Sequence, residues 1–288
     1  MGRKSFTEIG VLGLYTETPL HCGAESGAGY VDLPVQRERH TDYPVIPGST
    51  LKGVLHDELR GKLSDLDALF GTPDAKTPGT VSFGDGIVVA FPVRSSGAPF
   101  HWVTCPFVLE RAFRALGRPR KVDPPPAKAG WAAGDQEVLL DEVRLEKRPH
   151  ADLAQWAADL LDLLPDEAKG FAYTRKLFPD HLVVVSDEDF KELIQVGTEV
   201  VTRIKLNYLG TTVNLDSKEH PDDKKSEDLQ GNMFVEEVVP PETLFLCPLR
   251  ALEEPSQLVD ALPPVVRIGG DESIGRGVTH LKYLAARS

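Results

Sequence analysis

Strand-like and helix-like segments follow one another without regular alternation along this chain of 288 residues. Strand-like runs, rich in β-branched and aromatic residues, lie at 6–16, 80–93, 136–146, 181–185, 197–208 and on both sides of a glycine-rich loop in 265–284. Helical patterns lie at 48–63, 104–117, 151–164 and 187–196. A doubly wound parallel sheet needs regular alternation, and no sequence repeat occurs here. The sequence therefore predicts an α+β fold with a mainly antiparallel sheet.

Two segments of unusual composition interrupt this pattern. Residues 118–135 are rich in Pro, Gly and Ala, which predicts an exposed connector, a surface insertion within one domain spanning 1–288. Residues 210–231 have almost no apolar content and lie between two strand-like runs. They are predicted to form the mobile tip of an extended hairpin.

The chain carries the signs of a cytoplasmic protein that does not contact a membrane. No apolar run approaches the roughly 20 residues of a membrane span. The N-terminus has no signal-peptide apolar core. Cys22, Cys105 and Cys247 are odd in number and lack metal-ligand spacing, which indicates a reducing compartment.

The formal net charge of −12 is distributed unevenly. Residues 1–150 contain 18 Lys and Arg against 19 Asp and Glu, whereas residues 151–288 contain 14 against 25. A near-neutral N-terminal half leaves room for a local basic groove, so the overall acidity does not exclude a nucleic-acid partner.

A glycine-rich loop, IGGDESIGRG at 268–277, could bind a phosphate. Gly269, Gly270, Gly275 and Gly277 surround Arg276. Glycines permit close backbone approach, and successive N–H groups can hold an anion. The loop is neither a Walker loop nor a Rossmann fingerprint. A tight β-loop-β connection without a ligand explains the local pattern equally well.

A second candidate anion site lies at the start of the first predicted helix, PGSTLKG at 47–53. Ser49 is the expected N-cap, and Lys52 adds a positive charge to a helix N-terminus. The apolar face of this helix comprises Leu51, Val54, Leu55 and Leu59. The alternative is an ordinary capped helix with a solvated lysine.

The stretch GAGYVDLPVQRERH, 27–40, contains one acid between apolar neighbours. Asp32 has no second carboxylate, serine elbow or CxxC beside it, and the basic pair Arg37 and Arg39 follows. His21 precedes it by eleven positions and could act as a general acid or base, or simply as a hydrogen-bonded loop residue. The sequence alone leaves the function of Asp32 open.

Glu236 and Glu237 follow the polar segment 210–231 in the sequence FVEEVVPPET. Adjacent side chains of a strand point to opposite faces, so only one of the two can face a shared site. The other is expected to be a solvated surface acid.

These segments together resemble one protein family. The motifs that carry the resemblance, in order, are TPLHCG, VDLPVQRERH, PVIPGSTLKGVL, VSFGDGIVVAFPVRS, HWVTCP, VVTRIKLN, EEVVPPETLF and IGGDESIGRG. They resemble the backbone RAMP subunit of Cmr, the type III-B CRISPR effector complex, which cuts target RNA.

The resemblance implies a modified ferredoxin-like (RRM-like) RAMP palm, with the glycine-rich loop near its C-terminus and an inserted β-hairpin thumb at about 203–237. It implies copies stacked head to tail along a CRISPR RNA, together with other Cmr subunits. The thumb would disrupt the guide–target duplex at regular intervals, where a complementary single-stranded target RNA is cut.

The resemblance also implies roles for individual residues. Asp32 is the residue that cuts, with His21 and either Glu236 or Glu237 assisting. The expected RNA-binding residues are Arg37, Arg39, Ser49, Lys52, Gly269, Gly270, Gly275, Arg276 and Gly277.

An ordinary Asp, with a pKa of about 3.9, is a weak base at neutral pH. Beside RNA phosphates, Asp32 would more naturally hold a divalent ion, Mg²⁺ or Mn²⁺, while the RNA 2′-hydroxyl attacks. Whether Asp32 is a metal ligand or a general base stays open. Other possible functions are a non-catalytic RNA-coating subunit, a RAMP that trims precursor CRISPR RNA, and a small-nucleotide enzyme using the loop Gly269–Gly277.

Overall fold

The computed structural model of the protein describes residues 5–24, 31–72, 74, 76–134, 136–205, 232–253 and 255–286. The predicted hairpin tip at 210–231 lies outside these residues. The strands are β1 Thr7–Thr16, β2 Val45–Ile46, β3 Val81–Phe83, β4 Gly86–Arg94, β5 Phe100–Thr104, β6 Ala129–Ala132, β7 Glu137–Leu140, β8 Val143–Arg148, β9 Leu182–Val184, β10 Glu199–Lys205, β11 Asn232–Val238, β12 Leu244–Ala251, β13 Val265–Arg267 and β14 Val278–Ala285. The α-helices are α1 Gly48–Leu59, α2 Leu66–Phe70, α3 Pro106–Ala115, α4 Leu153–Leu161, α5 Ala172–His181, α6 Asp187–Gly197 and α7 Ser256–Ala261.

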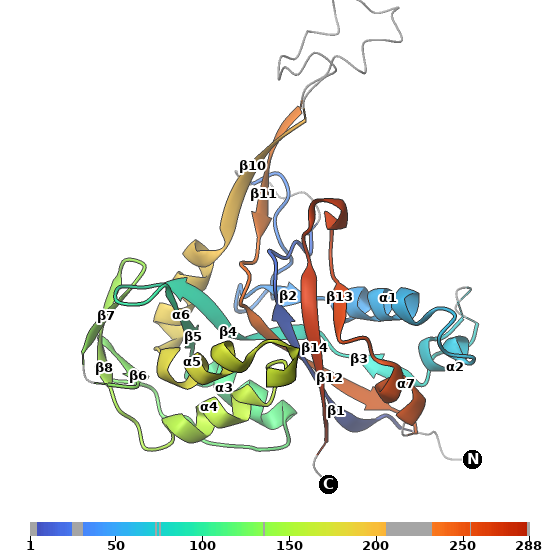
Figure 1. The fold of residues 1–288 in the computed structure, drawn as a ribbon, viewed down its shortest axis with the longest axis horizontal. Coiled ribbons are helices and arrows are strands. Elements are labelled where there is room, and N and C mark those ends of the chain that lie inside the picture. Colours follow the sequence, from blue (N-terminus) through green and yellow to red (C-terminus); the bar gives the residue numbers. More distant parts are fainter. Residues whose placement is uncertain are drawn as a thin grey trace, which may run out of the picture.

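One large sheet organises the described chain (Figure 1). Its main path runs β13-β14-β1-β12-β4-β5-β9-β6-β8-β7, with β2 paired to β4 and β3 to β12. Only the β5–β9 and β6–β8 pairs among its described strands are parallel. The predicted α+β class and mainly antiparallel sheet are confirmed.

Helices cover both faces of this sheet, and β1 and β12 contribute side chains to each core. In β1, Leu12 and Leu14 pack in the cluster that contains α1, α6 and α7, whereas Val11 and Tyr15 pack in the cluster that contains α4 and α5. Alternate residues of a strand point to opposite faces. Because both faces are buried from Gly10 onward, this part of β1 is largely apolar, which explains why its sequence alternates only loosely.

Gly13 of β1 marks a close approach to the α4 side of the sheet. A Cβ atom at this position would lie 2.2 Å from the carbonyl oxygen of Leu163. Any other residue would therefore push the segment after α4 away from the sheet.

Helix α1 packs as its sequence pattern predicts. Leu51, Leu55 and Leu59 are buried, and Val54 packs at the edge of the same core. The predicted cap is wrong, because Ser49 lies inside the helix and is exposed. The free N–H of Gly48 instead donates to Oδ1 of Asp85 at 2.8 Å, so an acid from the turn between β3 and β4 satisfies the helix start.

The segment 118–135 is not simply an exposed connector. Its residues Ala129–Ala132 form β6, which joins the sheet between β8 and β9. Arg118 and Arg120 anchor its beginning through the buried carboxylate of Asp159, with N···O distances of 2.9 and 2.6 Å. This part of the expectation is therefore corrected.

Strands β10 and β11 form a separate antiparallel ribbon that projects from the body of the molecule (Figure 1). Its register runs from Glu199 opposite Val238 to Lys205 opposite Asn232. Glu236 and Glu237 lie near its base, on β11. None of the helices in the described residues is long and apolar enough to span a membrane.

Candidate active site

Two segments of the N-terminal loop lie against the base of β11 and bring His21 and Asp32 to it. Backbone bonds join Leu20 to Val239 in both directions, at 2.9 and 2.8 Å. A parallel bridge joins Leu33 to Glu236. The structure thus brings together residues that are more than 200 positions apart in the sequence.

Asp32 is attached to β11 through its neighbour Val235. Its N–H donates to the Val235 carbonyl at 3.0 Å, and its Oδ2 accepts the Val235 N–H at 2.8 Å. The residue is exposed, so its Oδ1 can meet a ligand from solvent. The hydrogen bond fixes the direction of the carboxylate without enclosing it.

Glu236 is the glutamate that faces His21. It is fully buried, and its Oε2 accepts hydrogen bonds from Arg276 at 2.5 Å and from Arg203 at 3.4 Å. Its Oε1 has no hydrogen-bond partner and lies 3.6 Å from Nδ1 of His21. Arg203 also binds Asp271, at 2.5 Å. Two carboxylates and two guanidinium groups therefore form one charged cluster, which His21 adjoins through Glu236.

Burial raises the pKa of Glu236, and the nearby Asp271 adds to this effect, although Arg276 and His21 oppose it. The pKa of Asp271 is lowered by its hydrogen bond with Glu236 and by Arg203. The surroundings of Glu236 thus disfavour its ionised form, and a perturbed pKa of this kind is common at functional sites.

The tautomer of His21 follows from its surroundings. Nδ1 lies 2.8 Å from the carbonyl oxygen of Glu237, which can only accept a hydrogen bond. Nδ1 therefore carries the proton, and Nε2 is left as an acceptor. A Cβ atom on Gly23 would lie 2.9 Å from Nε2, so the glycine leaves this nitrogen uncrowded.

Glu237 points to the other side of β11 and is not a solvated surface acid. Its carboxylate accepts hydrogen bonds from Arg37 at 2.5 Å, the hydroxyl of Thr198 at 2.7 Å and the N–H of Val35 at 3.0 Å. Burial alone would raise its pKa, but the bonds from Arg37, Val35 and Thr198 outweigh burial and lower it. We call this cluster of Glu237, Arg37, Thr198 and Val35 the clamp.

The glycine-rich loop packs on the segment that carries His21. A Cβ atom on Gly269, whose φ is +87°, would lie 2.2 Å from the His21 carbonyl oxygen. The N–H groups of Gly270, Gly275 and Gly277 donate to the carbonyls of His21, Glu272 and Pro19. Those three amides are therefore not free to hold a phosphate in this structure, and RNA binding by the loop stays a prediction.

The remaining predicted RNA-binding residues lie in different surroundings. Arg37 and Arg276 are engaged in the clamp and with Glu236, respectively. Arg39 is exposed and makes no side-chain hydrogen bond or ion pair with any described residue. Ser49 and Lys52 line a cavity elsewhere, beside α1. RNA binding by these residues stays a prediction.

Sequence reasoning missed several members of the site. Arg203, Asp271 and Thr198 carry no local signal, since each acts through a partner distant in the chain. Asp271 lies in the glycine-rich loop, but its positive φ of 64°, which Asp tolerates better than most residues, is seen only in the structure.

The described residues contain no cluster of three or more His, Cys, Asp or Glu suited to a metal ion. Asp32 has one carboxylate oxygen that is not used by Val235. Mg²⁺ often uses only one or two protein carboxylates and completes its shell with water and phosphate oxygens. The free oxygen of Asp32 can therefore supply one ligand to such an ion, and the described residues do not enclose one.

Comparison with known proteins places this chain and its fold in a class. A sequence model of the RAMP superfamily matches residues 14–280. The CRISPR system Cmr endoribonuclease Cmr4 of Pyrococcus furiosus is 30% identical over 289 residues, which cover 93% of this chain and 92% of that protein. The chain therefore belongs to the RAMP superfamily, and within it to the Cmr4 type.

Solved structures agree with this assignment. Oligomeric Cmr4 from Pyrococcus furiosus matches with a TM-score of 0.70 and 25% identity, covering 96% of this chain and 98% of that one. A chain of the type III-B Cmr-beta complex bound to cognate target RNA matches with a TM-score of 0.70 at 20% identity, over 96% of this chain and 98% of that one. The second match supports the fold alone.

Proposed function

We propose that the protein is a backbone subunit of a type III-B CRISPR effector complex, where it binds CRISPR RNA and cuts complementary target RNA at regular intervals. The observation that carries this proposal is the placement of Asp32, and of His21 beside Glu236, at the base of a projecting hairpin, in a chain of the Cmr4 type. The main sheet would be a ferredoxin-like palm, and the ribbon within about 203–237 the thumb. Copies would stack head to tail in the cytoplasm, together with the other Cmr subunits.

The site supports attack by the RNA's own 2′-hydroxyl. Nε2 of His21 is an acceptor that can take the proton of this hydroxyl, and Oε1 of Glu236 lies where it stabilises the resulting imidazolium. The 2′-oxygen then bonds to phosphorus, and the bond to the 5′-oxygen of the next nucleotide breaks. The products are a 2′,3′-cyclic phosphate and a 5′-hydroxyl, which takes up a proton.

Asp32 would hold the reacting phosphate region in place. Its carboxylate is fixed by the Val235 N–H and open to solvent. A Mg²⁺ or Mn²⁺ ion bound there would neutralise phosphate charge. Arg39 and Lys52 would contact the RNA backbone, each as one phosphate contact.

The variant Asp32→Asn tests this proposal. Asn keeps an oxygen that can accept the Val235 N–H, but it loses the charge. Target cleavage by the assembled complex should fall at least about a hundredfold, with assembly and target binding unchanged. Normal cleavage by this variant would remove the catalytic role of Asp32.

Two further measurements test the chemistry. A target with 2′-deoxy sugars at the cut positions should bind and resist cleavage, and wild-type cleavage should stop in chelator and return with Mg²⁺. Cleavage of the deoxy target would mean that water is the nucleophile. Activity unaffected by chelator would exclude the metal role.

A second candidate is a non-catalytic RNA-coating subunit. The bond between Asp32 and the Val235 N–H favours it, because holding the loop would by itself explain why a carboxylate stands at this position. The Asp32→Asn variant separates the two functions, because a coating subunit has no cleavage to lose.

A further inference from the structure

A cavity of about 560 Å³ lies beside α1, away from His21, Asp32 and Glu236. Its walls come from the start of α1, the end of α2, the loop that follows, β3 and the N-terminal segment at Phe6. A second cavity, of about 310 Å³, adjoins it and shares Lys52 and Phe70 as walls. Neither cavity has an assigned role in the site described above.

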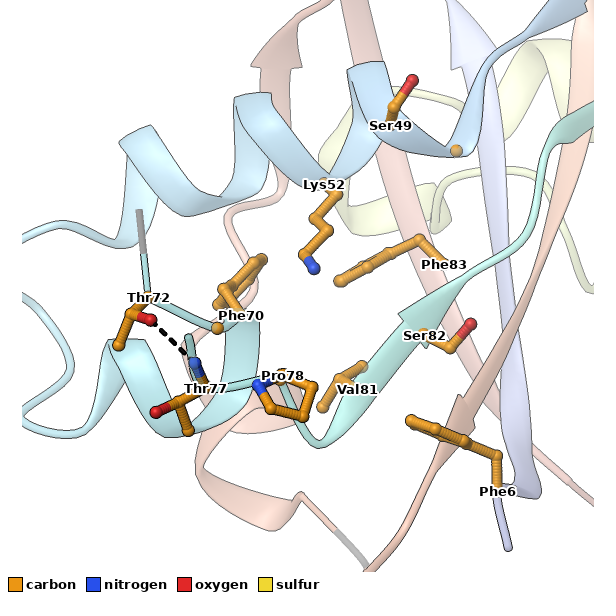
Figure 2. Close-up of a pocket in the computed structure, with 13 residues that line it drawn as sticks. Phe6, Ser49, Lys52, Phe70, Thr72, Thr77, Pro78, Val81, Ser82 and Phe83 are labelled. Atoms are coloured by element: carbon orange, nitrogen blue, oxygen red, sulfur yellow. Dashed lines mark hydrogen bonds between the residues drawn. The ribbon is translucent and has the colours of Figure 1, made fainter. Parts of the chain in front are cut away.

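Lys52 is the single charged side chain among the lining residues of the larger cavity. It makes no hydrogen bond or ion pair with any described residue, although the chain has a net charge of −12. Figure 2 shows the Lys52 side chain running from α1 into the cavity, with its amino group between Phe70 and Phe83. An unpaired ammonium in a cavity without acids favours an anionic ligand.

Aromatic rings form the other distinctive wall. The rings of Phe70 and Phe83 stack with centroids 5.6 Å apart and an interplanar angle of 21°. Phe6, which borders the same cavity near Ser82, is 45% exposed. An exposed phenylalanine beside a lysine offers a flat apolar surface together with a positive charge.

Hydrogen bonds and one close backbone contact connect the described residues of the remaining wall. The N–H of Thr72 donates to the Thr77 carbonyl at 3.0 Å, and the N–H of Thr77 donates to the Thr72 hydroxyl at 3.1 Å. A Cβ atom on Gly79 would lie 2.5 Å from the Leu69 carbonyl oxygen, so the two arms of the loop touch. The cavity is therefore formed before a ligand arrives.

We propose that this cavity is a nucleotide subsite that takes one ribonucleotide of the bound RNA, with the base against Phe6 and the Phe70–Phe83 pair and a phosphate at Lys52. This inference rests on the proposed RNA-binding function and adds a base pocket to it. Surfaces that bind single-stranded RNA combine aromatic stacking with a cation for the backbone, and this cavity holds both. The nucleotide belongs either to the guide or to the target strand.

Crosslinking in the assembled complex identifies the strand. 5-Iodouridine is placed along the guide in one preparation and along the target in another, and the crosslinked peptides are identified by mass spectrometry. Crosslinks to the peptide with Phe6 or the peptide with Phe83 are expected in one of the two preparations. Their absence from both, with crosslinks elsewhere in the chain, would overturn the subsite.

Affinity measurements test the two contacts separately. With single-stranded RNA and the full chain, Phe6→Ala should weaken binding about tenfold, as expected for one lost stacked base. Lys52→Gln should reduce the slope of log affinity against log salt concentration by about one. An RNA with abasic sites should bind the wild type more weakly and should abolish the difference between wild type and Phe6→Ala.

Two control variants separate these effects from general changes in surface. Tyr173→Ala removes an aromatic ring that is 71% exposed on α5, and Lys62→Gln removes a lysine just beyond α1. Both should bind RNA as the wild type does. Wild-type affinity of Phe6→Ala would overturn the base pocket alone, whereas no RNA binding by the wild type would overturn the proposed function as well.

Discussion

Glu236 and Glu237 follow one another on β11, and their side chains lie on opposite sides of the strand, in opposite electrostatic surroundings. Glu237 is satisfied by three donors of the clamp, and its pKa is lowered. Glu236 is fully buried with one unpartnered oxygen near His21, and its pKa is raised. Glu237 thus holds the loop on one side of β11, and Glu236 contributes its carboxylate to the candidate site on the other.

This difference matters because the clamp holds the loop that carries Asp32. Glu237 accepts the N–H of Val35 and the guanidinium of Arg37, which itself donates to the Asp42 carbonyl at 2.7 Å. Both ends of the segment that follows Asp32 are therefore fixed to β11. The clamp holds the candidate catalytic acid in position, and the face with Glu236 and His21 is where the proposed proton transfer would take place.

Replacing Glu236 should have the largest effect on activity. Glu236→Gln removes the charge that stabilises an imidazolium at His21, so single-turnover cleavage by the assembled complex should fall about a hundredfold. Burial disfavours this charge, but Arg276 loses its counter-charge with it, so the melting temperature should change little. Glu237→Gln is the matched control. If it lowers cleavage as much as Glu236→Gln does while leaving stability intact, the two glutamates do not have the different roles inferred here.

Replacing Glu237 should have the largest effect on stability. Glu237→Ala leaves Arg37 without its counter-charge in a half-buried position, which should lower the free energy of unfolding by about 3 kcal/mol. Denaturant unfolding of the isolated chain measures this loss. Glu137→Ala, which removes a pair with Arg144 on the surface at 3.2 Å, should change nothing measurable. Equal unfolding midpoints for the two variants would contradict the clamp.

The pH dependence of stability should have opposite signs for the two glutamates. The lowered pKa of Glu237 means that its contribution is fully present above the unfolded-state pKa of about 4.3 and is lost as pH falls through the lower folded-state pKa. The raised pKa of Glu236 means that its ionised form destabilises the fold above its folded-state pKa. Glu237→Gln should thus be less stable than wild type at pH 7 and equal to it in acid.

Glu236→Gln provides the opposite case in the same titration. Its stability relative to wild type should be highest at neutral pH and should decline towards acid, where Glu236 becomes protonated in both states. Denaturant unfolding at a series of pH values measures both curves. Parallel curves for the two variants would show that the two carboxylates do not differ in environment.

Local sequence patterns predicted the parts of the fold that depend on local signals. The apolar face of α1 was predicted from its helical period, and the strand β1 from its run of β-branched, aromatic and other apolar residues. Strand β6, with the sequence AGWA, and helix α5, with Pro179 inside it, were missed. Small residues and a proline hide these elements, which form because neighbouring strands and helices provide their packing.

The site was predictable only in part for a similar reason. His21, Asp32 and the pair of glutamates were found through motifs, and the structure shows that Glu236 is the one beside His21. The clamp could not be predicted, because Arg37 and Glu237 are 200 positions apart and neither carries a local pattern that names its partner. Arg37 was expected to bind RNA as part of the basic pair that follows Asp32, and its pairing with Glu237 became visible only in the structure.

The smallest expected effects separate Arg39 from Arg37. Both follow Asp32 in the sequence, but Arg39 is exposed, whereas Arg37 donates to Glu237, Thr198 and the backbone. Arg39→Ala should keep the wild-type unfolding midpoint, and its RNA affinity should show a salt slope shallower by about one, the loss of a single phosphate contact. Arg37→Ala should lower the free energy of unfolding. The fraction of this variant that stays folded should bind RNA with the same salt slope as the wild type. Because the two arginines are only two positions apart, this pair of variants distinguishes a charge used for folding from one available to RNA.

An Arg39→Ala chain with an unchanged salt slope would place the RNA backbone on another surface. An Arg37→Ala chain with the stability of the wild type would show that the clamp does not hold the loop.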